Sequence, residues 1–219
     1  MIIDNTVNID NAQEFMGLME EYKSKNDYIF RGHRERITNL LPVMYRNCDE
    51  QERLNKIKDF IDYMNTKYSS EDNKPGLMND LAALDCMAIE QNSNGGTFFL
   101  DATEDPLIAT FFSTNTRDNY NREAYELKFP IQVIAINTKD KNNVFTELKR
   151  VETDNFEEEI NRLYELSKKE IMIYDVESAK AIQYHVQNIF AQKGCFLLGH
   201  PELWKNVHCD EILLHDGAT

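Results

Sequence analysis

Residues 97–112 read TFFLDATEDPLIATFF and hold three structural signals in one short stretch. The apolar run 97–100 predicts a strand that lies inside the core. The Asp-Pro pair at 105–106 predicts the start of a helix, with the aspartate as N-cap and the proline as the first helical residue. We expect Asp101 and Thr103 to lie at the carboxyl end of the strand, beside a helix N-terminus, where many folds gather ligand-binding groups.

The sequence on either side of this stretch predicts helices and strands in an irregular order. Apolar residues that repeat every three to four positions predict helices over residues 11–24, 50–68, 77–91 and 155–169, and one from about residue 182 to Gly194. Short β-prone or apolar runs predict strands over residues 28–30, 131–136, 171–176 and 195–198. Because the order has neither regular β-α alternation nor an internal repeat, we expect an α+β fold rather than a doubly wound α/β fold. We expect a single compact domain over residues 1–219, with a central mixed or antiparallel sheet and flanking helices.

The chain is strongly acidic. Its 219 residues include 24 Lys and Arg against 38 Asp and Glu, which gives a net charge of −14 and a pI near 4.8. Such a surface repels phosphate groups over a Debye length of about 8 Å, which disfavours a long nucleic-acid groove and docking on anionic lipid. The glutamates at 157–159 are expected on the solvated face of their helix.

The composition indicates a folded protein that crosses no membrane. Hydrophobic residues make up 42% of the chain and aromatic residues 11%, which is enough to build a core. No apolar run approaches the ~20 residues of a membrane span, and the first residues lack the pattern of a secretory signal, so we expect a cytoplasmic protein. The wide spacing of the cysteines predicts mostly buried free thiols rather than a disulfide framework; they are Cys48, Cys86, Cys195 and Cys209. Segment 200–215, which contains three histidines and one cysteine, lacks the paired spacing of a zinc site.

One window of the chain is positively charged. Residues 31–46 hold four arginines against one glutamate, a local charge of +3, which leaves −17 to the remainder of the chain. An arginine side chain can bind a phosphate through two parallel hydrogen bonds, so the window is a candidate anion site. The other interpretation is that these arginines form ordinary surface salt bridges with the abundant carboxylates.

The acidic and hydroxyl residues at 101–105 also allow two interpretations. Asp101, Thr103 and Asp105 can compete to cap the following helix, which explains Asp105 but leaves Asp101 unexplained. Alternatively, Asp101, Glu104 and Asp105 can hold a divalent metal for phosphodiester hydrolysis, because hard cations prefer carboxylate oxygens.

Segments in both regions resemble the FRG domain family, which is named for an aromatic-Arg-Gly motif. The run YIFRGH at 28–33, followed by LLP at 40–42 and by Arg46, resembles the opening motif of the family. The run QNSNGGT at 91–97, followed by LDAT at 100–103, is similar to its central motif.

A third segment, AQKGCF at 191–196, matches the late Gln-x-Gly-x-Phe element of the family. The chain departs from the family pattern in the central motif. Asn92 stands where the family usually has a histidine, residues 94–96 read NGG where it usually has Gly-Leu-Pro, and Phe98 stands where it usually has an arginine.

The layout of FRG domains is similar to that of ADP-ribosyltransferases, and this resemblance implies a function. It implies NAD as the cofactor, no metal, and a protein or nucleic acid as the acceptor. It further implies a toxin or phage-conflict effector with an antitoxin or regulatory partner. The implied catalytic residues are Arg31, which would clamp the pyrophosphate, and Asp101 and Gln192, which would stabilise or orient the reacting ribose.

The resemblance also implies a set of cofactor-binding residues. The backbone of Gly32 is expected to approach the nicotinamide amide, and Phe30 or Phe112 to stack on the nicotinamide ring. Asn92 and Thr103 are expected to complete the cofactor site. Two other functions remain open: a non-catalytic nucleotide- or RNA-binding module, and the metal-dependent nuclease described above.

Overall fold

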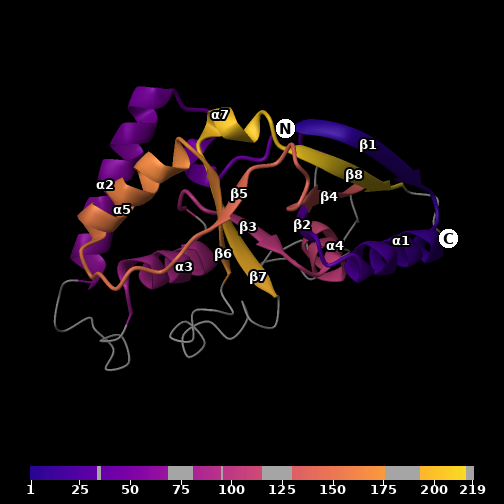
Figure 1. Ribbon diagram of the computed structural model, residues 1–219, viewed down its shortest axis with the longest axis horizontal. Coiled ribbons are helices and arrows are strands. Elements are labelled where there is room, and N and C mark those ends of the chain that lie inside the picture. The colour runs from indigo at the N-terminus through magenta and orange to yellow at the C-terminus, as the bar shows by residue number, and fades with distance from the viewer. Residues whose placement is uncertain (34–35, 69–80, 95, 115–129, 176–192, 216–219) are drawn as a thin grey trace, which may run out of the picture. The chain divides into compact units, whose positions relative to one another are not determined.

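The computed structural model describes residues 1–33, 36–68, 81–94, 96–114, 130–175 and 193–215 (Figure 1). The chain divides into two compact units. Unit 1 comprises Met1–Leu40, Asp101–Phe145 and Lys205–Thr219, and unit 2 comprises Leu41–Leu100 and Thr146–Trp204. The expectation of one domain over residues 1–219 is not tested by this division and stays a prediction.

In its described residues, unit 1 contains five strands of the sheet and two helices. Its strands are β1 (Ile2–Ile9), β2 (Tyr28–His33), β3 (Leu100–Thr103, of which the last three residues belong to this unit), β4 (Ile131–Asn137) and β8 (His208–Leu214). They lie in the order β1-β8-β4-β2-β3. β1 is parallel to β8, whereas the β8–β4, β4–β2 and β2–β3 pairs are antiparallel. β1, β8 and β2 therefore finish at the sheet end where β3 and β4 begin, which we call the motif end.

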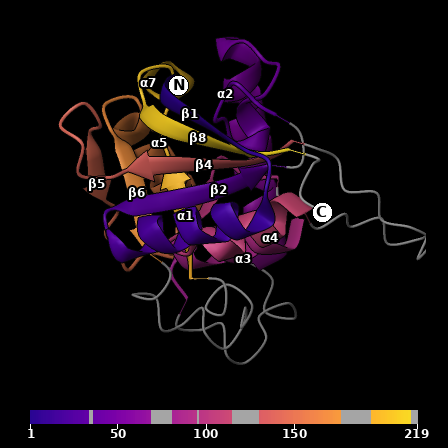
Figure 2. The same ribbon diagram turned by 90° about the vertical axis from the view of Figure 1, so that its right-hand side faces the viewer.

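The helices α1 (Ala12–Ser24) and α4 (Pro106–Thr114) cover one face of this sheet (Figure 2). The strand register places Gly32 opposite Val133, and Val133 opposite Ile212. These positions face the helices, and the core of unit 1 lies between them. Since successive side chains of a strand point to opposite faces, Arg31 points to the other face, in one row with Ile134.

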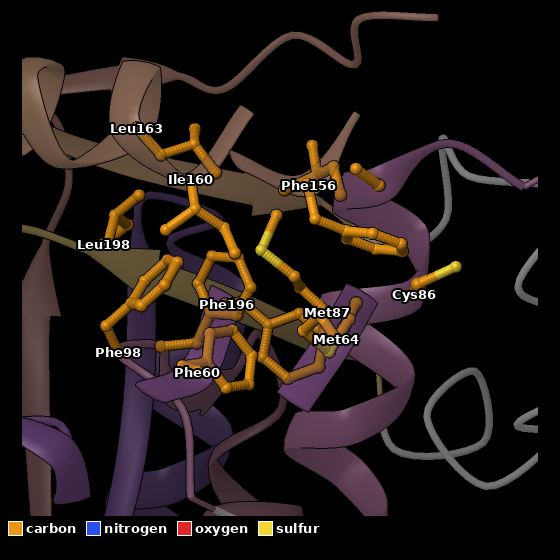
Figure 3. Packing of buried hydrophobic residues seen from close by; sticks show 14 of the residues in the cluster. Phe60, Met64, Cys86, Met87, Phe98, Phe156, Ile160, Leu163, Phe196 and Leu198 are labelled. Atoms are coloured by element: carbon orange, nitrogen blue, oxygen red, sulfur yellow. The ribbon is translucent and has the colours of Figure 1, made fainter. Parts of the chain in front are cut away.

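Unit 2 is built mainly from helices. They are α2 (Glu50–Tyr68), α3 (Ala83–Asn94), α5 (Phe156–Ser167) and α7 (Pro201–Trp204), with the 3₁₀ turn η1 (Val43–Tyr45). Its strands lie in the order β7-β6-β5 and are β5 (Phe145–Glu147, which begins at the unit boundary), β6 (Ile171–Asp175) and β7 (Gly194–Leu198). The core contains a cluster of aromatic rings and methionines, of which Phe60, Met64, Met87, Phe98 and Phe196 are visible in Figure 3.

Buried carboxylates of unit 2 are held by hydrogen bonds. Asp85 accepts hydrogen bonds from the Tyr174 hydroxyl at 2.8 Å and from Arg150 Nε at 2.7 Å. Glu159 is also buried and pairs with Arg162, with two N–O distances of 2.7 Å. The prediction that residues 157–159 all lie on a solvated face is therefore wrong for Glu159, because a neighbouring arginine offsets the cost of its burial.

The α+β class is confirmed, because both units combine helices with largely antiparallel strands. The ADP-ribosyltransferase-like arrangement stays a prediction. One predicted strand is displaced: the strand expected over 97–100 is β3, which begins at Leu100. Residues 77–80 and the helix predicted from about residue 182 lie outside the described residues.

Two further expectations concern the cysteines and the membrane. All four cysteines are free, and all but Cys48 are buried, as predicted. Within the described residues, no helix combines the length and the apolar character needed to cross a membrane.

Candidate functional site

Arg31 and Asp101 lie together at the motif end of unit 1. β3 runs antiparallel to β2 with Thr103 opposite Phe30, which brings Asp101 beside the end of β2. Arg31 Nη1 donates a hydrogen bond to the main-chain oxygen of Asp101 and lies 3.8 Å from Asp101 Oδ2. The arginine side chain is half-buried, whereas the Asp101 carboxylate is exposed. Two of the three predicted catalytic residues are thus adjacent, although they are distant in the sequence.

Gly32 lies inside β2, so the strand predicted over residues 28–30 extends to His33. A Cβ atom at Gly32 would lie 1.7 Å from the carbonyl oxygen of Ala109 and 3.0 Å from the backbone nitrogen of Ser113. The backbone of α4 therefore packs directly on the backbone of β2. The helix fills the space that a Gly32 side chain would occupy, and the predicted contact of the Gly32 backbone with the nicotinamide amide stays a prediction.

Phe30 and Thr103 are core residues. Phe30 is 1% exposed, and its ring packs against the rings of Tyr22 and Tyr28 at centroid distances of 6.1 and 6.2 Å. Thr103 is buried, and its hydroxyl accepts a hydrogen bond from the backbone nitrogen of Asp105 at 3.1 Å. Both side chains are buried in the core, and the cofactor-binding roles predicted for them stay predictions.

Asp105 is the N-cap of α4, as predicted. Its Oδ1 accepts a hydrogen bond from the backbone nitrogen of Leu107 at 3.0 Å, and its Oδ2 pairs with Lys23 Nζ at 2.9 Å. Among the described residues, no group of three or more His, Cys, Asp or Glu side chains could hold a metal ion. The metal-site interpretation of Asp101, Glu104 and Asp105 thus has no support in their placement.

Arg36, from the positive window, is committed to a buried carboxylate. Its Nε and Nη2 donate to the two oxygens of Glu211 at 2.8 and 2.7 Å, and Gln132 and Thr6 donate to the same carboxylate. Burial tends to raise the pKa of Glu211, but these hydrogen bonds outweigh burial, so its pKa lies below the ordinary value. The salt-bridge interpretation is confirmed for Arg36. Sequence reasoning missed Glu211, whose only signal is its place in the partly alternating run of β8.

Three further predicted site residues have no described contact with Arg31: Phe112, Asn92 and Gln192. Phe112 lies on α4 and is 40% exposed. Asn92 is an exposed residue of α3, in unit 2. Gln192 and Arg34 lie outside the described residues. The roles predicted for Phe112, Asn92 and Gln192 stay predictions.

Comparison with known proteins identifies the family of this region. Residues 26–122 match the family model of the FRG domain. No curated protein and no solved structure matches the chain. The matched range contains both Arg31 and Asp101, and it includes two of the three segments that resemble the family. The chain therefore contains an FRG domain.

Proposed function

We propose that the protein is an NAD-dependent ADP-ribosyltransferase whose site is formed by Arg31 and Asp101. The observation that carries the proposal is their pairing at the motif end, within the range that matches the FRG domain. An arginine beside an exposed carboxylate offers one group for the anionic part of NAD and one for the cationic centre that forms when NAD is cleaved.

The proposed reaction breaks the bond between the ribose and the nicotinamide. Nicotinamide leaves with the bonding electrons, the ribose gains oxocarbenium character, and a nucleophile of the acceptor forms the new bond and releases its proton. The Asp101 carboxylate stabilises the positive charge on the ribose. Arg31 binds the pyrophosphate, and its hydrogen bond to the Asp101 main chain holds the guanidinium beside that carboxylate. Gln192 remains a predicted third member of the site.

NAD titration by calorimetry tests the binding half of the proposal. Arg31→Lys keeps the charge but loses the planar fork, so we expect it to weaken NAD binding by about tenfold or more. The control is Lys168→Ala, which removes an exposed ion pair in unit 2 and should leave NAD binding unchanged. Absence of binding by the wild type at millimolar NAD contradicts the proposal.

Labelled NAD tests the catalytic half. Wild-type protein incubated with NAD and a cell lysate should release nicotinamide and transfer the label to a macromolecule. Asp101→Asn should bind NAD with similar affinity but react about 100-fold or more slowly, because the charge that stabilises the ribose is lost. Binding without nicotinamide release by the wild type identifies a nucleotide-binding module instead. For the cell, the same proposal implies a toxin or phage-conflict effector that is controlled by an antitoxin or regulatory partner.

A further inference from the structure

The helices of unit 1 expose an apolar patch. It is formed by Phe111 and Phe112 on α4, which are 59% and 40% exposed; α1, which contacts α4, exposes Met16 to 45%. The two phenyl rings pack edge to face with centroids 6.1 Å apart. α4 contains no charged residue. Single exposed apolar residues are ordinary, but neighbouring aromatic rings on one surface are typical of a contact site.

The α1–α4 patch lies at the motif end. β1 and β2 run in the same direction, so α1, which connects them, runs back, and its first turn lies at the motif end. Lys23, near the end of α1, pairs with the N-cap of α4, so α4 begins at the opposite end and finishes at the motif end. The contacts of Ala109 and Ser113 with Gly32 place the intervening turn, including Phe111, next to the Arg31 strand.

Among the described residues, the charged side chains at the start of α1 are negative. Asp10 and Glu14 are exposed at the start of α1, on the same side of the sheet as the patch. Arg36 does not offset these charges, because it pairs with Glu211 on the sheet face opposite the helices. The net charge of the whole chain is −14. A phosphate backbone would meet carboxylates at this surface, whereas a lysine or arginine side chain can pair with them and lie over a phenyl ring.

We propose that the α1–α4 patch docks a Lys/Arg-rich segment of the acceptor, and that the acceptor is therefore a protein. The inference rests on the proposed transferase function, because it assigns the substrate class of that site. The aromatic rings supply contact area and cation–π attraction, and the acidic residues steer the basic segment to the motif end.

A labelled peptide tests this docking without NAD, so the result is independent of whether NAD binds. The probe is a 12-residue peptide of alternating arginine and serine, followed by fluorescence anisotropy; the comparison probes are a glutamate-serine peptide and a 12-nucleotide single-stranded RNA. We expect binding of the arginine probe alone, weakened by salt. Phe111→Ala and Glu14→Gln should each weaken it about two- to fivefold.

Two control variants separate the patch from the general acidity of the protein. Val144→Ala removes an apolar side chain of unit 1 that is 67% exposed, and Glu157→Gln removes an exposed carboxylate of α5. Both should bind the arginine probe as the wild type does. The proposal is overturned if the wild type does not bind this probe, if it binds the RNA as tightly, or if the control variants weaken binding as much as the patch variants.

Discussion

Gly32 is the residue at which a helix backbone meets a strand backbone. The atoms that a Cβ would overlap belong to the main chain of Ala109 and Ser113, so they cannot rotate away as a side chain would. We predict that Gly32→Ala lowers the free energy of unfolding by about 3 kcal/mol or more, at the upper end of the usual cost of overpacking. Urea unfolding followed by circular dichroism measures this difference.

Gly17 provides the matched control for this prediction. It lies inside α1, and a Cβ at this position would have nothing within 4 Å. Gly17→Ala should therefore stabilise the protein by about 0.5–1 kcal/mol, the helix preference of alanine over glycine. A Gly32→Ala variant as stable as the wild type would show that α4 does not pack directly on β2.

At the scale of elements, the Glu50 carboxylate joins α2 to α5. The Tyr164 hydroxyl donates to Glu50 Oε1 at 2.5 Å, and Arg53 Nη2 donates to Oε2 at 2.7 Å. These hydrogen bonds, with a smaller one from His200, lower the pKa of Glu50 from 4.5 to about 2. A carboxylate with a lowered pKa stabilises the folded state above its unfolded pKa and loses that contribution as the pH falls.

We therefore predict an acid-dependent difference between the wild type and Glu50→Gln. Their difference in unfolding free energy should be constant above pH 4.5 and should shrink as the pH falls from 4.5 towards 2, the pKa of folded Glu50. Tyr164→Phe removes the largest cause of the lowered pKa, so the contribution of Glu50 should vanish at a higher pH in that variant. Urea unfolding at a series of pH values measures both effects, and a difference that does not change with pH contradicts the assignment.

The elements also show which parts of the fold the sequence predicts. Periodic apolar residues and a strong cap are local signals, so α2 and the start of α4 are predicted at the residues where they occur. The bounds of a strand depend on its distant partners. β3 spans Leu100–Thr103 and is aligned with β2 by the pairing of Thr103 with Phe30, a contact that no local sequence pattern contains. β1 was not predicted, since an edge strand with mostly exposed side chains lacks a clear apolar alternation.

In the candidate site, too, local signals are predicted from the sequence, whereas contacts between distant residues are not. Arg31 and Asp101 are predicted through the family resemblance, and the register of β2 and β3 explains why they meet. The burial of Phe30 and Thr103 is a property of packing between layers, which spacing along the chain does not reveal. Glu211 was missed because a glutamate in an acidic chain gives no sign that an arginine and a glutamine will bury it.

At the scale of the whole molecule, the proposed activity predicts an effect on growth. Induced expression in a bacterial host should slow growth if the protein consumes NAD or modifies essential macromolecules. Arg31→Ala should restore growth at an equal protein level, because it removes the group that binds the pyrophosphate. Growth curves with immunoblots of expression measure this, with Lys168→Ala as the variant that should remain toxic. Equal growth inhibition by Arg31→Ala would separate the toxicity from this site.

The position of β8 between β1 and β4 has a consequence for synthesis on the ribosome. β1 is made first, yet its sheet neighbour consists of residues 208–214, and every residue of unit 2 emerges between the two. Unit 1 therefore cannot complete its sheet until residues 208–214 have left the exit tunnel, and β1 lacks its sheet neighbour until then, whereas β2, β3 and β4 can already pair with one another. Unit 2 has all of its own strands available earlier, so vectorial synthesis favours its assembly first.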